Sequence, residues 1–503
     1  MPELPPSATT MSASQDPRAG DPQRIGTDPT DHRRTAVSGV VWASLGIAAS
    51  QILRLGGNVV LAHQLFESAF GVMALVNVFW TGMQLFSDLG VWRSVTQHPR
   101  GNEPQFLNTA WTVQALRGVA LWVVCCILAW PYASYYDEPM LAPYILVSGL
   151  TAVFDGLRSP SLMVLRRQVS VGSITVMNVG AQLVSIVTMI TWAAISPTVW
   201  ALVAGLVAGG GFSMIFSHTW MRLYRPRFQL DRETLRELLK IGKWVFLSTA
   251  LSFLAAQGDR LLLGKLVDKD EFGLFCIALG LCGIVTMLAH ELLQNVVFPL
   301  ISREQKDAER VAEKFLRARG MMLGTCSGSC AAIVLGSPLF FGFLYDDRYI
   351  DSGWQAQWIC LSLWFQVMAM GLELVPFALG NARVSFLGGC VRMTGIPLAY
   401  IGFQMRGIPG FVIGFAISNL LALLALTACF PRKKAAVLGQ SLSYSLGAGA
   451  YVALALLVAA YVETRWSWRA GAASRALLAA IPLAWSGWYA LQQLLRRRAS
   501  ANS

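Results

Sequence analysis

The chain has 503 residues, of which 55% are apolar and only 14% are charged, whereas a soluble domain carries about 25% charged residues. Apolar runs of about 20 residues recur along most of its length, and 17 tryptophans and 45 glycines accompany them. These features exclude a large soluble protein and indicate a protein that crosses a membrane many times.

The first 36 residues differ from the rest. They are rich in Pro, Ser, Thr, Asp and Gly and contain no apolar run. This composition is typical of a disordered tail, because too little apolar surface is available to offset the entropy of ordering. We expect no signal peptide here, since no short apolar core with a cleavage site precedes the first apolar run.

Fourteen apolar segments follow, and each approaches the length that a helix needs to cross about 30 Å of hydrocarbon. We therefore expect an all-α polytopic membrane protein with about fourteen transmembrane helices. The segment at 141–158 is short, and the one at 272–298 is long enough to kink. The expected spans are 38–62, 70–92, 109–130, 141–158, 171–194, 198–217, 243–264, 272–298, 320–344, 355–379, 385–404, 408–430, 441–462 and 471–494.

Basic residues divide unequally between the two sides of these spans. Most of the 40 Lys and Arg residues fall in the segments on the side of the termini. The opposite loops hold only Lys265, Lys269, Arg348, Arg406, Arg465, Arg469 and Arg475. By the positive-inside rule, both termini are expected in the cytoplasm.

Two cytoplasmic segments are basic and amphipathic. Met221–Trp244 begins with basic residues around Pro226 and continues with leucines on one side, and Ser302–Gly320 sets apolar residues against a charged face. Both patterns favour helices that lie on the cytoplasmic leaflet. Contact with anionic lipid or a lipid phosphate is one interpretation, and simple anchoring is the other.

One short sequence pattern occurs twice in the chain. Phe70-Gly71 follows an acidic and polar patch, and Phe272-Gly273 repeats this pattern 202 residues later. Six spans separate the two copies, so both copies face outward. This arrangement predicts a parallel repeat of two six-span lobes.

The repeat divides the chain into five parts. The expected parts are a disordered cytoplasmic tail at 1–36, an N-lobe at 37–220 with spans 1–6, a basic amphipathic linker at 221–242, a C-lobe at 243–434 with spans 7–12, and spans 13–14 with a basic tail at 435–503.

Two-lobed helical membrane proteins of this kind are mostly transporters in which one lobe rocks against the other. No pore loop typical of a channel is visible, and the short outer loops do not suit a membrane glycosyltransferase. The chain also lacks the GxxxxGK[ST] motif of direct ATP drive. We expect a transporter and not an enzyme.

Ionisable residues within spans are the best functional candidates, because a charge at bilayer depth is costly unless it faces a cavity or a partner. Arg54 and Arg260 occupy nearly equivalent places in the two repeats, one turn apart after the offset, and would clamp an anion between the lobes. Arg117 and Arg392 lie nearer the cytoplasmic side. Four arginines at two depths predict a cationic path, and the planar guanidinium suits phosphate.

The acidic candidates for coupling or gating are Asp88, Asp259, Glu291 and Glu373. Asp259, Glu291 and Glu373 give weaker support for a coupling-cation site. Asp88 and Asp155 fit ordinary helix-end carboxylates. We expect His290 to pack near Glu291.

The nine cysteines all lie in apolar runs, and no histidine lies near Cys326 and Cys330, which share a helix face. We expect packing thiols and no metal site.

Two stretches resemble a known family. LAHQLFESAFGVMALVNVFWTGMQLFSDLGV at 61–91 and GDRLLLGKLVDKDEFGLFCIA at 258–278 are similar to bacterial lipid-linked oligosaccharide flippases of the Wzx type, the O-antigen and exopolysaccharide exporters of the multidrug/oligosaccharidyl-lipid/polysaccharide exporter superfamily. The resemblance covers roughly 37–435. It implies two six-helix lobes around a basic cavity and an undecaprenyl-pyrophosphate-linked repeat unit as substrate, turned from the cytoplasmic to the periplasmic leaflet. Asp88 and Asp259-Arg260 lie on the matching patterns, whereas Arg117, Arg392 and Glu373 rest on the burial argument alone.

Three functions stay open at this point. The first is a flippase for polyprenyl-linked oligosaccharide in the bacterial inner membrane, working by alternating access and driven by a proton, a sodium ion or the membrane potential. The second is a cation-coupled multidrug or metabolite exporter, which should rely more on buried carboxylates. Lipid II flippases also have fourteen spans and cavity arginines, so lipid II stays open as an alternative substrate of the first. The third is a non-transporting scaffold for a polysaccharide synthase. Expected partners are the lipid-linked oligosaccharide, anionic lipid and a polysaccharide polymerase complex, and no nucleic acid.

Overall fold

The computed structural model describes residues 29–87, 103–167, 171–221, 223–224, 226–231, 253–297, 308–378, 383–430, 433–465 and 468–500. Within these ranges the regular structure is helical throughout, and each expected span is helical over most of its described length. The expected fold class, an all-α multi-pass membrane protein, is confirmed.

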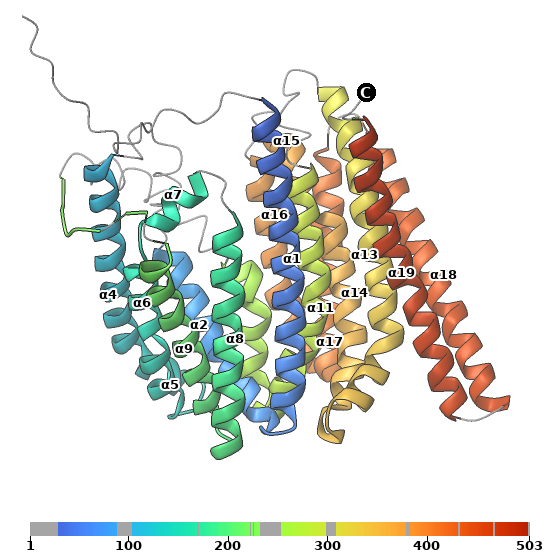
Figure 1. Cartoon of the computed structure of the whole chain (residues 1–503). Helices are drawn as coiled ribbons and strands as arrows, with labels where there is room; N and C mark the ends of the chain where they lie inside the picture. The colour runs from blue at the N-terminus through green and yellow to red at the C-terminus, as the bar shows by residue number, and fades with distance from the viewer. Residues whose placement is uncertain are drawn as a thin grey trace, which may run out of the picture.

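The N-terminal half forms one group of helices, drawn in blue to green in Figure 1. Helix α8 packs against both α1 and α9, and α4 packs against α5 and α6. The short expected span at 141–158 is made of two helices that meet at Gly149. The elements of this half are α1 (Pro29–Ala62), α2 (Glu67–Ser87), α4 (Pro104–Tyr135), α5 (Leu141–Ser148), α6 (Leu150–Leu157), α7 (Ser161–Arg167), α8 (Val171–Ile195) and α9 (Val199–Thr219).

The second group begins with a helix at 253–266. The kink expected in the span at 272–298 appears as the π-helix η1 at the end of α11. Its elements are α11 (Lys269–Leu292), η1 (Leu293–Val297), α13 (Ala308–Leu344), η2 (Asp347–Tyr349), α14 (Asp351–Ala369), α15 (Leu374–Ala378), α16 (Arg383–Met393) and α17 (Gly395–Ala428).

Helix α17 is two spans joined by a tight turn. Gly407 has a φ of 61°, a left-handed conformation that suits glycine, and Arg406 beside it is also non-helical. The two arms then run so close together that a Cβ at Gly402 would lie 2.1 Å from the Gly410 carbonyl oxygen. Glycine at both positions permits this approach, which makes spans 11 and 12 a closely packed hairpin.

The last two helices, α18 (Lys434–Arg465) and α19 (Trp468–Ser500), form an edge of the molecule and pack on α13 (Figure 1). Few side chains of α18 are buried. In a membrane its many exposed apolar side chains face lipid, so no further protein contact is needed to explain them.

The two lobes meet where the repeated pattern lies. A Cβ at Gly71 would lie 2.4 Å from the Lys269 carbonyl oxygen, and one at Gly273 would clash with the carbonyl oxygen of Glu67. Beside them the Ser68 amide donates to the Asp270 carboxylate across 3.0 Å, between residues 202 positions apart. Helices α2 and α11 thus cross with equivalent residues facing each other, as a two-fold axis between the repeats requires.

Further bonds join the outer ends of the lobes. The Tyr349 hydroxyl donates to the Leu65 carbonyl at 3.2 Å, and the Tyr136 hydroxyl donates to the Leu261 carbonyl at 3.0 Å. Arg348 approaches Glu67 at 3.5 Å. Each lobe therefore contributes one tyrosine that bonds the backbone of the other lobe, and together these contacts close the side that the positive-inside rule predicts to face outward.

The expected leaflet helix at Ser302–Gly320 is wrong for its described part. From Ala308 onward these residues continue into α13 without a break. Val311 and Phe315 are 0% and 1% exposed, and the Phe315 ring lies 5.5 Å from that of Phe430. The apolar face that suggested contact with lipid packs against the C-lobe instead, because the helix axis follows the span.

The described residues of the inter-lobe linker, 221, 223–224 and 226–231, are not helical and run beside α4. The Arg227 amide donates to the Asn108 side chain and the Gln229 amide to the Thr112 hydroxyl, at 3.0 and 3.1 Å. The leucines on which the expected amphipathic helix depends lie outside the described residues. The first helix also begins earlier than expected, since Pro29 to residue 36 belong to α1, and proline is a favourable first helical residue.

Candidate functional site

Arg54 lies in α1 and lines a cavity of about 450 Å³ between α1 and α8. Ser50, Gln51 and Asn178 provide polar groups there, and Met287 of α11 closes one side from the other lobe. Gln51 also donates to the sulfur of Met287, which connects the lobes at this depth. Among the described residues, none forms a hydrogen bond or ion pair with the Arg54 guanidinium.

Arg260 does not line that cavity. Its guanidinium donates to the Gln257 side chain of the same helix, and its amide donates to the Asp259 carboxylate at 2.8 Å. The clamp between Arg54 and Arg260 therefore stays a prediction.

A second cavity, of about 460 Å³, lies within the N-lobe between α2, α4 and α6. Arg117 points its guanidinium to the Ser87 hydroxyl at 2.8 Å and also donates to Gln114 and to the Gln84 carbonyl. Asp155, at the other wall, pairs with Arg158 at 2.7 Å and accepts from the Gln84 side chain at 3.3 Å. Sequence reasoning found Arg117 here and treated Asp155 as an ordinary helix-end carboxylate.

Four further residues of this cavity were missed from the sequence: Trp80, Gln84, Gln114 and Arg158. The two glutamines carried a signal, since amide side chains within apolar spans need partners. Arg158 sits just after α6, at the edge of an expected span, so that its charge looked like an ordinary inner-loop charge.

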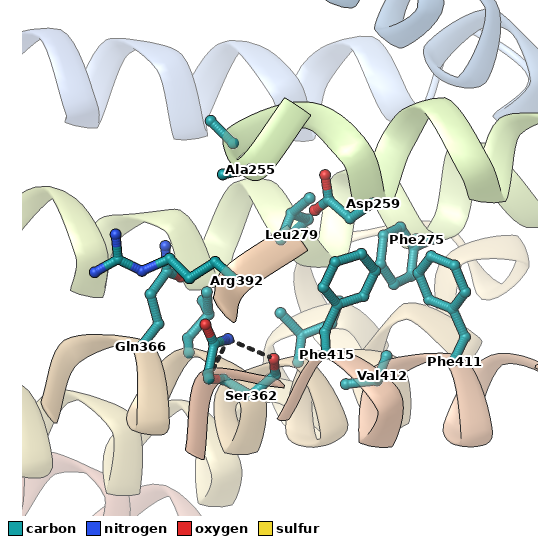
Figure 2. A pocket seen from close by; sticks show the side chains of 14 residues that line it. Ala255, Asp259, Phe275, Leu279, Ser362, Gln366, Arg392, Phe411, Val412 and Phe415 are labelled. Carbon is teal, nitrogen blue, oxygen red and sulfur yellow. Dashed lines mark hydrogen bonds between the residues drawn. The ribbon is translucent and has the colours of Figure 1, made fainter. Parts of the chain in front are cut away.

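The third cavity, of about 100 Å³, lies in the C-lobe (Figure 2). Asp259 and Arg392 both line it, but the Arg392 guanidinium points away from the Asp259 carboxylate. Arg392 instead approaches Glu373 at 3.5 Å. The Asn419 amide donates to both oxygens of Ser362 at 3.4 Å and ties α17 to α14 across the cavity.

The three acidic candidates that the structure describes are not brought together. Glu373 lies with Arg392, Asp259 lines the C-lobe cavity, and Glu291 lines none of the three cavities. Within the described part of the chain, no group of three His, Cys, Asp or Glu side chains is placed to hold a metal ion. Asp88 lies outside the described residues. His290 is exposed, so the packing expected for it is wrong.

Two helical lobes, joined at one side of the membrane and each containing a polar cavity, define the architecture of a membrane transporter. The particular family follows from comparison with known proteins. Residues 60–349, more than half of the chain, match the family described as polysaccharide biosynthesis protein, and the chain belongs to this family. The resemblance drawn from its two repeated stretches is confirmed.

Individual proteins agree with this assignment. The chain is 20% identical to the lipopolysaccharide biosynthesis protein WzxC of Escherichia coli K12 over 77% of its own length and 79% of that protein. In structure it is similar to the lipid II flippase MurJ in an inward closed conformation, with a TM-score of 0.67 over 91% of this chain and all of that chain, at 14% identity. A multidrug resistance MATE family transporter in an inward-facing conformation gives a TM-score of 0.60 over 79% of this chain and 98% of that one, also at 14% identity. At such identities the structural likeness shows the fold alone.

Proposed function

We propose that the protein is a flippase that moves polyprenyl-pyrophosphate-linked oligosaccharide repeat units from the cytoplasmic to the periplasmic leaflet of the bacterial inner membrane. Its family and its similarity to a lipopolysaccharide biosynthesis protein support a role in exopolysaccharide or O-antigen assembly. Both termini lie in the cytoplasm in this proposal, as the distribution of basic residues predicts.

The observation that carries the proposal is Arg54. Among the described residues the Arg54 guanidinium has no hydrogen-bonding partner, which is costly at membrane depth, and the cavity beside it offers room for an anionic ligand. The planar fork of arginine binds two phosphate oxygens at once. Ser50, Gln51 and Asn178 add hydrogen-bonding groups, and the described lining contains no carboxylate that would repel a phosphate.

The contacts between the lobes support alternating access. Gly71 and Gly273, where α2 and α11 cross, and the two tyrosines that bond across the lobes hold one end of the lobes together. With both termini in the cytoplasm, this end faces the periplasm, and its closure would block release on that side. This is the arrangement expected while the head group loads from the cytoplasmic leaflet. Release then requires these outer contacts to break, and the residues only bind and move the substrate, so no covalent step is involved.

The source of energy is part of the proposal. A proton, a sodium ion or the membrane potential drives the change, with Asp88, Asp259, Glu291 and Glu373 as the candidate coupling or gating groups. Arg117, Arg260 and Arg392 stay candidates for the cationic path. Anionic lipid at the cytoplasmic surface and a polysaccharide polymerase complex are the proposed further partners.

The test uses cells that depend on this protein for surface polysaccharide. Arg54→Ala, at normal protein level, should lower export about tenfold or more and accumulate lipid-linked repeat units on the cytoplasmic side, because charged hydrogen bonds to the diphosphate are lost. Arg54→Lys keeps the positive charge but lacks the planar fork, so its export should lie between that of the wild type and that of Arg54→Ala. Arg406→Ala, an exposed arginine in the outer turn of α17, is the matched control.

Three results would contradict the proposal. Normal polysaccharide in the Arg54→Ala strain would remove Arg54 from the substrate path. A changed sensitivity to cationic drugs would favour the multidrug exporter, and a peptidoglycan defect with accumulated lipid II would favour the lipid II flippase.

A further inference from the structure

We infer that the N-lobe cavity between α2, α4 and α6 is a carbohydrate subsite that holds a sugar residue of the lipid-linked substrate, separate from the diphosphate site at Arg54. This inference rests on the proposed function and goes beyond it, because it assigns the two chemical parts of the substrate to two cavities.

The first argument is the size of the cavity. Its volume of about 460 Å³ falls within the range of about 300–1,000 Å³ that is typical of small-molecule sites. The C-lobe cavity, of about 100 Å³, is too small for a sugar, although it also contains polar side chains. Of these two cavities, only the one between α2, α4 and α6 is large enough for a sugar.

The second argument is the mixture of donors and acceptors. The Gln84 and Gln114 side chains each carry both kinds of group, Asp155 accepts, and Arg117 donates. A sugar hydroxyl both donates and accepts, so it can use every one of these groups. Phosphate has only acceptor oxygens at neutral pH, and it could use only part of this lining.

The third argument is charge. Asp155 lies in the same cavity as Arg117 and Arg158, and it is paired with Arg158 at 2.7 Å. A diphosphate placed here would meet a carboxylate and would compete with it for the guanidinium groups. The Arg54 cavity has no such carboxylate among its lining residues. The diphosphate therefore suits Arg54, and a neutral, hydroxyl-rich group suits the N-lobe cavity.

The fourth argument is the apolar part of the wall. Trp80 lines the cavity from α2, the helix that also forms the lobe interface, and Gly118 and Gly156 line it where α4 and α6 cross closely. A sugar ring has apolar faces between its hydroxyls, and a tryptophan offers a flat apolar surface to one of them. Because α2 also contacts α11 of the other lobe, a change in the contact between the lobes would alter the wall of this cavity.

The test compares two ligands on the purified full-length protein in lipid nanodiscs. The first is undecaprenyl pyrophosphate without sugar, and the second is the native lipid-linked repeat unit, extracted from cells in which the gene for this protein is deleted. Wild-type protein should bind the glycosylated lipid about tenfold or more tighter, since several hydroxyl hydrogen bonds are added. Asp155→Asn and Trp80→Leu should each reduce that ratio severalfold while the affinity for undecaprenyl pyrophosphate is unchanged, and Arg54→Lys should weaken both ligands alike.

The outcomes separate the two proposals. If wild-type protein binds neither lipid, the flippase function fails. If both bind equally well, or if the ratio survives in both cavity variants, the carbohydrate subsite fails and the flippase stands. If the cavity variants weaken undecaprenyl pyrophosphate as much as the glycosylated lipid, the cavity holds the diphosphate and the inference is overturned. Thr81→Ala, a smaller change in the same wall, keeps the test valid if Asp155→Asn does not fold.

Discussion

At the scale of single residues, Arg319 shows how a charge can be structural in this protein. It is fully buried, and its guanidinium donates to the Met368 carbonyl and the Ser441 hydroxyl, both at 2.8 Å, and to Gln440 at 3.0 Å. These partners lie on α14 and α18, so one side chain of α13 binds three helices together. Arg319 is thus one of the links between the appended helix α18 and the C-lobe.

Replacing Arg319 by methionine should therefore destabilise the protein. The change removes a charged donor from the buried Met368 carbonyl and from the half-buried Gln440 side chain, at a cost of about 2–3 kcal/mol or more. We expect a clearly lower thermal unfolding temperature in detergent. Arg317→Met, at an exposed position two residues earlier on α13, should change stability by no more than about 0.5 kcal/mol. Equal effects of the two variants would contradict the role of Arg319.

The sequence predicted the residues of the site only in part. Arg54 and Arg117 were found because a charge within an apolar span is conspicuous, and each lies at a cavity. Arg319 was missed because it ends a highly charged segment, where its neighbours face water. Sequence spacing also placed Arg54 and Arg260 at matching heights, but height does not determine the direction of a side chain around the helix axis.

At the scale of elements, the crossing of α2 and α11 depends on the absence of side chains. Gly71 and Gly273 each bring their helix against the backbone of the other, at the outer ends of both. Gly280 lies on α11 with nothing within 4 Å of the place where a Cβ would be. Gly273 and Gly280, both on α11, thus offer a direct comparison between a glycine that is needed for packing and one that is not.

Gly273→Ala should push the outer ends apart and favour the outward-open arrangement. Overpacking of this kind costs about 1–3 kcal/mol, which is enough to shift a two-state equilibrium. Spin labels at Thr198 and Arg406, in outer loops of the two lobes, should report a longer mean distance when the exposed cysteines are removed. Gly280→Ala should leave that distance unchanged, and a shift of equal size in both variants would count against the crossing as the outer closure.

The elements themselves were largely predictable, because hydrophobic length alone determines where a membrane helix can lie. The break between spans 11 and 12 was expected, and Arg406 and Gly407 form it. The failure at 308–320 has a physical cause. An apolar stripe has the same pattern whether it faces lipid head groups or a neighbouring helix, so the sequence did not reveal that Phe315 packs against Phe430.

At the scale of the whole molecule, the outer closure includes an ion pair between the lobes. Lys265, at the outer end of the helix at 253–266, pairs with Asp137 in the turn after α4. The hydrogen bond and the charge of Lys265 hold the pKa of the Asp137 carboxyl below its ordinary value. The pairing therefore favours the closed outer side as long as Asp137 is ionised.

The direction of the pH dependence follows from that lowered pKa. The contribution of Asp137 is fully present above the ordinary pKa of aspartate, about 3.9, and is lost as the pH falls through the lower value in the closed state. Acidifying the outer side below about pH 4 should thus lengthen the distance between labels at Thr198 and Arg406. Because the pair is exposed to solvent, raising the salt concentration should weaken the same contribution.

Asp137→Asn should reproduce at neutral pH the part of this change that belongs to the ion pair. It should also reduce the response to acid, since the titrating group is gone. Asp347→Asn removes one negative charge from the same outer surface, at an exposed position of η2, and should leave the acid response as it is in the wild type. If both variants keep the full response, other carboxylates control the outer side. If both lose it, the net charge of the outer surface is responsible, and the pair between Asp137 and Lys265 is not.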